Sequence, residues 1–305
     1  MDPLLILFGF GVGILVGTTG MGGGSLMTPL LILVFGIKPI VAIGTDLAYG
    51  AVTKTVGGWR HVRKGTVDFG IAGWLAVGSI PGAICGVIVL DQLRTAYGEK
   101  FDTIVLVAIA AALLFTGTAV LIRALFLPKL VQRERDTVKL DVRHKVAAVV
   151  IGVSVGFVLG VTSAGSGALI AIGLILAFRL TPHRVVGTDV FHAAILLWVA
   201  GAAHFISGNV DLALAANILI GSVPGVWIGA NISTRLSSDG LRPVLGIVLL
   251  AGGLGLLSKA GVDIPAFLLI GVPLSLGAVA YALHQMRVRA GTLPGAPKLP
   301  ASEQG

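Results

Sequence analysis

The chain has 305 residues, of which 55% are hydrophobic and 12% are charged, and its formal net charge is +8. A soluble domain carries about 25% charged residues, so this composition excludes an ordinary soluble domain and predicts an all-α protein that crosses a membrane several times. In such a chain an excess of Lys and Arg is typical of cytoplasmic loops, and we expect no nucleic-acid partner. The single cysteine excludes an intramolecular disulfide.

A glycine-rich stretch, Gly17-Thr-Thr-Gly-Met-Gly-Gly-Gly24, interrupts the first apolar run of the sequence. Each glycine costs a helix about 1 kcal/mol relative to alanine, so five glycines in eight residues predict a break. The flanking arms, Leu4–Val16 and Ser25–Phe35, would be about 16–20 Å long, whereas the hydrocarbon core of a bilayer is about 30 Å thick. We therefore expect two half-helices that meet at a glycine-rich tip inside the membrane.

The same pattern recurs in the second half of the chain, where Gly160–Gly167 lies between the apolar arms Val146–Leu159 and Ala168–Phe178. Placing Gly17 on Gly160 aligns Gly17–Gly86 with Gly160–Gly229 without a gap, and 26 of the 70 aligned positions are identical. We call this match, with its constant spacing, the repeat alignment. A shared register of this length predicts an internal duplication.

Further apolar segments follow each hairpin in chain order, separated by short polar loops. We expect spans at Pro39–Trp59, Phe69–Leu90, Thr103–Leu127, Pro182–Ile206, Leu212–Ile232, Leu241–Leu257 and Ile264–His284. These spans divide the chain into a first membrane repeat (1–127), a cytoplasmic linker (128–145), a second membrane repeat (146–286) and a cytoplasmic tail (287–305).

The distribution of Lys and Arg predicts the orientation of the chain in the membrane. Alternating the spans places seventeen basic residues on one face and four on the other, with Lys54 inside a span. The larger group should be cytoplasmic, which places the N-terminus outside and the C-terminus inside. The two repeats then have opposite orientations. Inverted repeats with broken helices are the architecture of many secondary transporters, which bind substrate near the bilayer midplane.

The two glycine-rich tips are the predicted binding site for a small anion. A helix that begins at such a tip offers unpaired N–H groups and the positive end of its dipole, and the hydroxyls nearby add hydrogen-bond donors. The substrate-binding candidates are Thr18, Thr19, Gly20, Gly22, Gly23, Gly24, Ser25, Thr162, Ser163, Gly165, Ser166 and Gly167. The alternative is that these glycines only allow close helix packing.

Polar residues inside the spans are the candidates for coupling or gating. Asp46 and Asp189 occupy matching positions of the two repeats, where a carboxylate costs about 2.5–3.5 kcal/mol to insert. They could bind a proton or a cation, or they could only form structural hydrogen bonds, with Thr45 and Thr188 assisting. Lys54 could meet an anion or a carboxylate, or extend to the cytoplasmic interface. His192 could relay a proton or be a neutral buried histidine.

The sequence contains no pattern typical of an enzyme. We find no cluster of His, Cys and carboxylates at metal-ligand spacing, no Walker-type loop and no nucleophile elbow. We therefore expect no catalytic residues, no metal site and no cofactor.

These motifs resemble the TauE/SafE sulfite-exporter family. In the first repeat they are Gly17-x-x-Gly20-x-Gly22-Gly23-Gly24 with Pro29, then Pro39 with Gly44-Thr45, then Gly65-x-Val67-Asp68. The second copy has Gly165-x-Gly167, Pro182, Gly187-Thr188 and Gly208-Asn-Val-Asp211, so the resemblance covers Phe8–Ile232. It implies a multi-pass protein of the bacterial inner membrane that moves sulfite, organosulfonates or related small anions. Asp46, Asp189 and Ser166 depart from the residues that the family favours.

Together the residues and the resemblance predict a secondary active transporter, an exporter, of sulfite, an organosulfonate or a related small anion. A proton or another ion would be the coupling partner. The alternatives are a passive anion channel and a membrane assembly partner that transports nothing. The identity of the substrate, the coupling ion and the oligomeric state stay open at this point.

Overall fold

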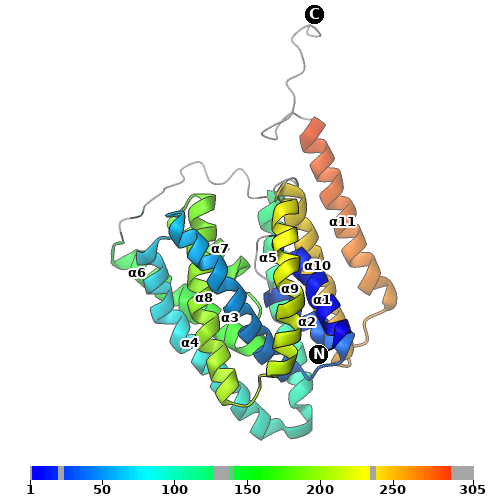
Figure 1. Ribbon diagram of the computed structural model, residues 1–305. Coiled ribbons are helices and arrows are strands. Elements are labelled where there is room, and N and C mark those ends of the chain that lie inside the picture. The colour runs from blue at the N-terminus through cyan, green and yellow to red at the C-terminus, as the bar shows by residue number, and fades with distance from the viewer. Residues whose placement is uncertain are drawn as a thin grey trace, which may run out of the picture.

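The computed structural model describes residues 2–19, 24–126, 138, 140–165, 167–233 and 238–289. Within these residues the chain is helical and contains no β-strand. Figure 1 shows the helices packed side by side as a bundle. The helices are α1 (Pro3–Thr19), α2 (Gly24–Phe35), α3 (Pro39–Arg63), α4 (Phe69–Tyr97), η1 (Gly98–Lys100), α5 (Phe101–Phe126), α6 (Val142–Thr162), α7 (Ala168–Gly173), the π-helix η2 (Leu174–Phe178), α8 (Pro182–Ile206), α9 (Leu212–Ser233), α10 (Ser238–Lys259) and α11 (Ala266–Arg289).

Two helix pairs, α1 with α9 and α4 with α6, are packed so closely that glycines of one helix touch the backbone of the other. A Cβ added at Gly9 would lie 2.6 Å from the carbonyl oxygen of Ile218. A Cβ added at Gly156 would overlap the carbonyl oxygen of Ser79. The matching contacts in the other pair join Gly152 to Leu75 and Gly13 to Ser222. The constant spacing of the repeat alignment, extended back to Gly9 in the first half and to Gly152 in the second, therefore maps these contacts of one pair onto the other pair. Small residues at helix interfaces let backbones approach in this way.

Helices α3 and α8 cross in an antiparallel direction near the centre of the bundle. Gly50 faces Leu197, whereas Gly57, further along α3, faces Val190, which comes earlier on α8. Helices α5 and α10 also run antiparallel, since Gly246 packs against Leu121 and Gly253 against Leu114. Helix α3 thus packs against α8, its counterpart in the repeat alignment, and α5 and α10, the helices that follow the two aligned segments, pack against each other.

Aspartates cap three of the long helices at their first turn. Asp68 accepts a hydrogen bond from the Ile71 N–H at 3.0 Å, and Asp211 accepts one from the Leu214 N–H at 2.9 Å. Asp141 accepts one from the His144 N–H at 2.9 Å, which lowers the pKa of its carboxyl. Such bonds satisfy N–H groups that have no partner inside the helix.

Removing one of these caps should cost a moderate amount of stability. We expect Asp68→Ala and Asp211→Ala each to lower the free energy of unfolding by about 1 kcal/mol, while Asp68→Asn and Asp211→Asn lose less because Asn also caps helices well. Thermal unfolding of the purified protein checks this. Equal melting temperatures for the Ala variants and the wild type would show that the caps contribute nothing.

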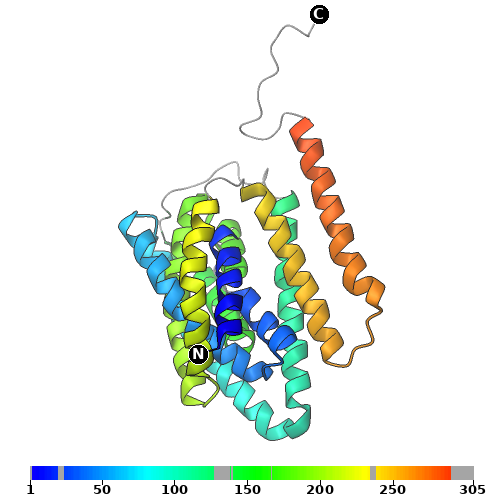
Figure 2. The same cartoon turned by 45° about the vertical axis from the view of Figure 1, so that its right-hand side comes forward.

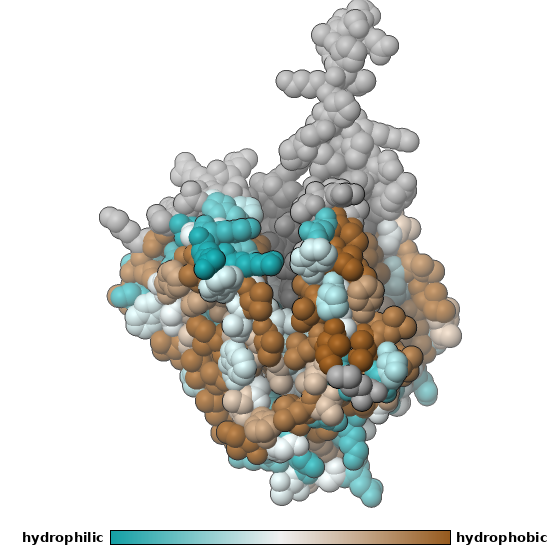
Figure 3. Space-filling view, in the orientation of Figure 1, coloured by the Kyte–Doolittle hydropathy of each residue, from teal (hydrophilic) through white to brown (hydrophobic). Residues whose placement is uncertain are grey.

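The outer surface of the bundle is suited to a membrane. Within the described residues, four helical stretches are long and apolar enough to cross one, namely Phe69–Ile122, Val142–Thr162, Pro182–Ile206 and Leu212–Gly229. Figure 3 shows hydrophobic residues over the middle of one face, with hydrophilic residues gathered toward its ends. Helix α11 stands to the side of the bundle next to α10 in both ribbon views (Figure 1 and Figure 2).

The predicted segments agree with the observed helices except at some boundaries. Pro182–Ile206 is the full extent of α8, and Ser25–Phe35 falls within α2. The predicted arms of about a dozen residues are too short, since α1 has 17 residues and α6 has 21. Helix α6 begins at Val142, inside the segment predicted as linker, because Asp141 caps its first turn. The first arm of the second hairpin is therefore long enough to cross a membrane on its own.

Candidate functional site

The turn that ends α6 packs against α2 and α3 deep in the bundle. Ser163, the first residue after α6, is buried and has a left-handed backbone with φ of 57°. Its hydroxyl donates to Asp46 Oδ2 at 2.9 Å, and the hydroxyl of Thr28 donates to the same oxygen at 2.7 Å. The two hydroxyl oxygens are themselves 2.5 Å apart. We call Thr28, Asp46 and Ser163 the oxygen triad.

The second tip also lies beside the beginning of α2. The backbone nitrogen of Gly165 is 3.5 Å from Ser25 Oγ, so the turn after α6 and the first turn of α2 are neighbours. Gly165 has φ of 102°, a conformation that residues with a side chain rarely adopt. On the other side, the buried ring of His204 hydrogen-bonds to the carbonyl of Gly160 at 2.9 Å and ties α8 to the last turn of α6.

A second group of buried polar side chains lies where α3 crosses α8. Lys54, 4% exposed, interacts electrostatically with Asp189, which is 6% exposed, and also with Asp46, which is 1% exposed. His192 is fully buried, and its Nε2 is 2.8 Å from Ser79 Oγ on α4. Burying charged groups is costly unless they are paired, so the proximity of Lys54 to the two carboxylates offsets part of that cost. We call Lys54, Asp189 and His192 the crossing cluster.

Thr45 and Thr188 hold loop backbones. The Asp211 N–H donates to Thr45 Oγ1 at 3.1 Å, and the Asp68 N–H donates to Thr188 Oγ1 at 2.9 Å. These two bonds correspond to each other under the repeat alignment. The first bond ties α3 to Asp211, the residue that caps α9. The second ties α8 to Asp68, the residue that caps α4.

The structure brings some of the predicted substrate-binding residues together and places others elsewhere. Ser25, Ser163 and Gly165 meet at the second tip. The Thr18 hydroxyl donates to Leu15 O at 2.9 Å and the Thr162 hydroxyl to Val158 O at 2.6 Å, so both bond within their own helices. Gly167 precedes α7, and Thr19 and Gly24 lie at the helix ends that flank the first tip. Gly20, Gly22, Gly23 and Ser166 lie outside the described residues.

Three polar residues of this region were not among the candidates. Thr28 carries a hydroxyl one turn after Ser25 on α2, a spacing that could have indicated it. Ser79 lies in the Gly-Ser-x-Pro-Gly motif that both repeats contain, so the duplication itself was a signal. For His204 the signal was its repeat in register with His61, but the sequence does not show that its ring reaches α6.

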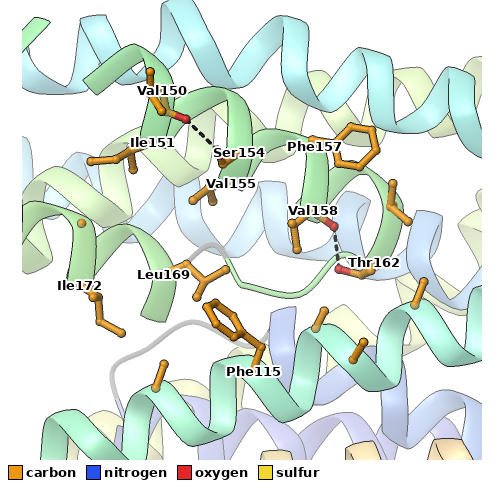
Figure 4. Close-up of a pocket in the computed structure, with 16 residues that line it drawn as sticks. Phe115, Val150, Ile151, Ser154, Val155, Phe157, Val158, Thr162, Leu169 and Ile172 are labelled. Carbon is orange, nitrogen blue, oxygen red and sulfur yellow. Dashed lines mark hydrogen bonds between the residues drawn. The ribbon is translucent and has the colours of Figure 1, made fainter. Parts of the chain in front are cut away.

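The described residues also form a cavity of about 650 Å³ that is separate from these polar groups. Helices α5, α6 and α7 line it mainly with apolar side chains, among them Phe115, Val155 and Leu169 (Figure 4). Thr162 is the only substrate-binding candidate in its lining, and its hydroxyl is bonded to Val158. The cavity therefore offers apolar contacts and little for an anion.

Long apolar helices surround a buried group of polar and charged residues, which defines a multi-pass membrane protein with a polar interior. The sequence profile of the family "Sulfite exporter TauE/SafE" matches residues 5–256, so the chain belongs to this family and is a membrane transporter. It is 40% identical over 257 residues to "Probable membrane transporter protein YjnA" of Bacillus subtilis, covering 84% of this chain and 100% of that one.

Two further relatives have the same description. The chain is 30% identical to "Probable membrane transporter protein YdhB" of Bacillus subtilis over 260 residues, which is 83% of this chain and 99% of the relative. It is 25% identical to "Probable membrane transporter protein MJ0441" of Methanocaldococcus jannaschii over 278 residues, 84% and 95% of the two chains. No solved structure matches the chain.

Proposed function

We propose that the protein is a secondary active transporter that exports sulfite, an organosulfonate or a related small anion, coupled to a proton or another ion. The observation that carries this proposal is the group of buried charges at the centre of the bundle. Asp46 and Asp189 share one neighbouring lysine, Lys54, so the group has an excess negative charge when all three are ionised. A buried excess charge is costly, and a bound proton or cation removes it.

The contacts between the two halves support an inverted repeat. The corresponding helices α3 and α8 pack antiparallel, and so do α5 and α10, which follow the two aligned segments. A two-fold axis in the membrane plane reverses a helix, whereas an axis along the membrane normal would leave the corresponding helices parallel. The matched bonds of Thr45 and Thr188 follow the same symmetry. Inverted repeats of this kind permit alternating access around a central site.

The anion would bind where the second tip meets the first turn of α2. Ser25, whose Oγ accepts from the Gly165 N–H, supplies its own O–H, and the N-terminus of α2 supplies the positive end of a helix dipole. In our proposal the N-terminus lies outside and the C-terminus in the cytoplasm, and the anion is exported across the inner membrane.

Flux measurements in proteoliposomes test the proposal. Labelled sulfite, taurine, sulfoacetate and small carboxylates are offered with and without a pH gradient, beside Asp46→Asn and Asp189→Asn. We expect at least one anion to cross at a rate that depends on the gradient, and at least one variant to lose that dependence. Flux without any dependence on an ion gradient would indicate a passive channel. Folded protein that moves no anion faster than empty liposomes would refute transport of these substrates.

A further inference from the structure

The oxygen triad has one proton too few if its carboxyl group is ionised. The distance from Thr28 Oγ1 to Ser163 Oγ is 2.5 Å, and Asp46 Oδ2 lies 2.7 Å from the first of these oxygens and 2.9 Å from the second. Each pair is therefore within hydrogen-bond distance. Three such contacts need three protons, one between each pair of oxygens. Two hydroxyl groups and a carboxylate supply two. A neutral carboxyl group supplies the third and closes a ring in which each oxygen donates once and accepts once. In this ring Asp46 Oδ2 accepts from one hydroxyl and donates its proton to the other, so one of the two bonds runs opposite to its direction around an ionised carboxylate.

We propose that Asp46 binds the coupling proton and that this proton fastens the second tip to α2 and α3 through the oxygen triad. The inference rests on the proposed function, since it names the coupling ion and its site. It assigns roles to Thr28 and Ser163 as the hydroxyls that complete the proton site. Asp189 then has the different role of counter-charge to Lys54.

The surroundings of Asp46 favour a neutral carboxyl group. Its side chain is 1% exposed, and Oδ1 has no hydrogen-bond partner among the described residues. The ionisable groups that face it are Lys54, two turns further along α3, and the phenol of Tyr49. Asp189, on α8, interacts with the same Lys54 and so competes with Asp46 for its charge. With Asp46 neutral, Lys54 and Asp189 balance each other.

Losing the proton would loosen the tip. The contact between Thr28 and Ser163 would then have no proton, and two oxygens 2.5 Å apart repel each other. Ser163 is held in a left-handed conformation that residues with a side chain rarely adopt. Release of the proton thus removes a bond that holds this strained turn against α2. The position of the tip, where we place the anion, becomes linked to the protonation of Asp46.

The other half of the molecule lacks this device. The repeat alignment places Asp46 on Asp189, but its spacing places Thr28 on Ala171 and Ser163 on Gly20. Ala171 and Gly20 have no hydroxyl group. The duplicated carboxylates are therefore not equivalent, and a single proton site follows from the sequence of the second tip.

Infrared difference spectroscopy tests the inference on purified full-length protein in lipid, without any anion. A pH step should reveal a protonated carboxylic acid band at the high-frequency end of its range, because Oδ1 accepts no hydrogen bond. We expect Asp46→Asn to abolish this band and Asp189→Asn to retain it. Persistence of the same band in Asp46→Asn, or its absence from the wild type at every pH at which the protein is folded, would overturn the inference.

Two further variants report on the triad even if Asp46→Asn does not fold. Ser163→Gly restores the residue found at the first tip and removes one hydroxyl, so the band should shift in frequency. Ser154→Ala removes a hydroxyl of the same helix that bonds to Val150 O, and it should leave the band unchanged. An unshifted band in Ser163→Gly would refute the triad. The infrared experiment measures no flux, so the proton site at Asp46 stands even if the protein transports none of the anions tested. If coupled flux is found but the carboxylic acid band is absent, only the proton site is overturned and the proposed transport stands.

Discussion

Replacing Lys54 with methionine is expected to destabilise the protein by about 3–5 kcal/mol, because it removes the buried cation that interacts electrostatically with Asp189 and leaves that buried carboxylate uncompensated. Methionine keeps most of the length and apolar volume of the lysine side chain, so the loss of charge dominates. Lys54 is 4% exposed and Asp189 6%, which leaves little water to solvate the remaining carboxylate. Thermal unfolding in detergent, with the yield of monodisperse protein, measures the effect.

A double substitution separates the two carboxylates. Because our inference makes Asp46 neutral and Asp189 the counter-charge of Lys54, the pair Lys54→Met and Asp189→Asn should recover most of the lost stability. The pair Lys54→Met and Asp46→Asn should recover much less. Coupling energies within such a network are about 0.5–3 kcal/mol, large enough to resolve. Equal recovery in both pairs would contradict the different roles assigned to the two aspartates.

The second large effect is expected at the interface between α4 and α6. A Cβ at Gly78 would overlap the carbonyl oxygen of Val149 and lie 2.9 Å from Val153 N, and neither backbone atom can move without shifting the helix. We expect Gly78→Ala to lower the free energy of unfolding by about 3 kcal/mol, the upper end of the range typical of an overpacked interior. Gly73→Ala, on the same helix with nothing within 4 Å of its Cβ, should change stability by at most about 1 kcal/mol.

The same comparison tests the duplication. Gly221 corresponds to Gly78 and its Cβ would overlap the carbonyl oxygen of Ile6, so Gly221→Ala should be as harmful as Gly78→Ala. Melting temperatures of the three variants measured side by side decide the matter. If Gly73→Ala and Gly78→Ala were equally stable, the close approach of α4 and α6 would be refuted.

The sequence predicted the helices well because glycine and proline mark the ends of apolar runs. The proline at Pro182 and the glycine at Gly208 bound α8, and the predicted bounds of that helix are confirmed. The predicted start of the helix α6, Val146, was wrong, because the charged residues before it are typical of a linker and only the capping hydrogen bond at Asp141 shows that the helix begins at Val142. Hydropathy cannot detect a single capping hydrogen bond.

The candidate site was harder to predict than the fold. Asp46, Asp189 and Lys54 stood out because charges are rare in apolar segments, and they are indeed buried. Thr28 did not stand out, since a threonine can bond within its own helix and costs little there. Its role depends on which face of α2 meets the second tip, and that follows from the packing of two segments 135 residues apart. No local pattern contains that information.

Coupling is the central claim, and uphill transport tests it most directly. Proteoliposomes are loaded with equal concentrations of labelled anion inside and outside, and a pH gradient is then imposed, with a protonophore as the control. We predict that the anion redistributes to unequal concentrations, that the protonophore abolishes this, and that Asp46→Asn only equilibrates the label or is inactive. If the anion crosses yet never departs from equal concentrations in the wild type, proton coupling at Asp46 is contradicted.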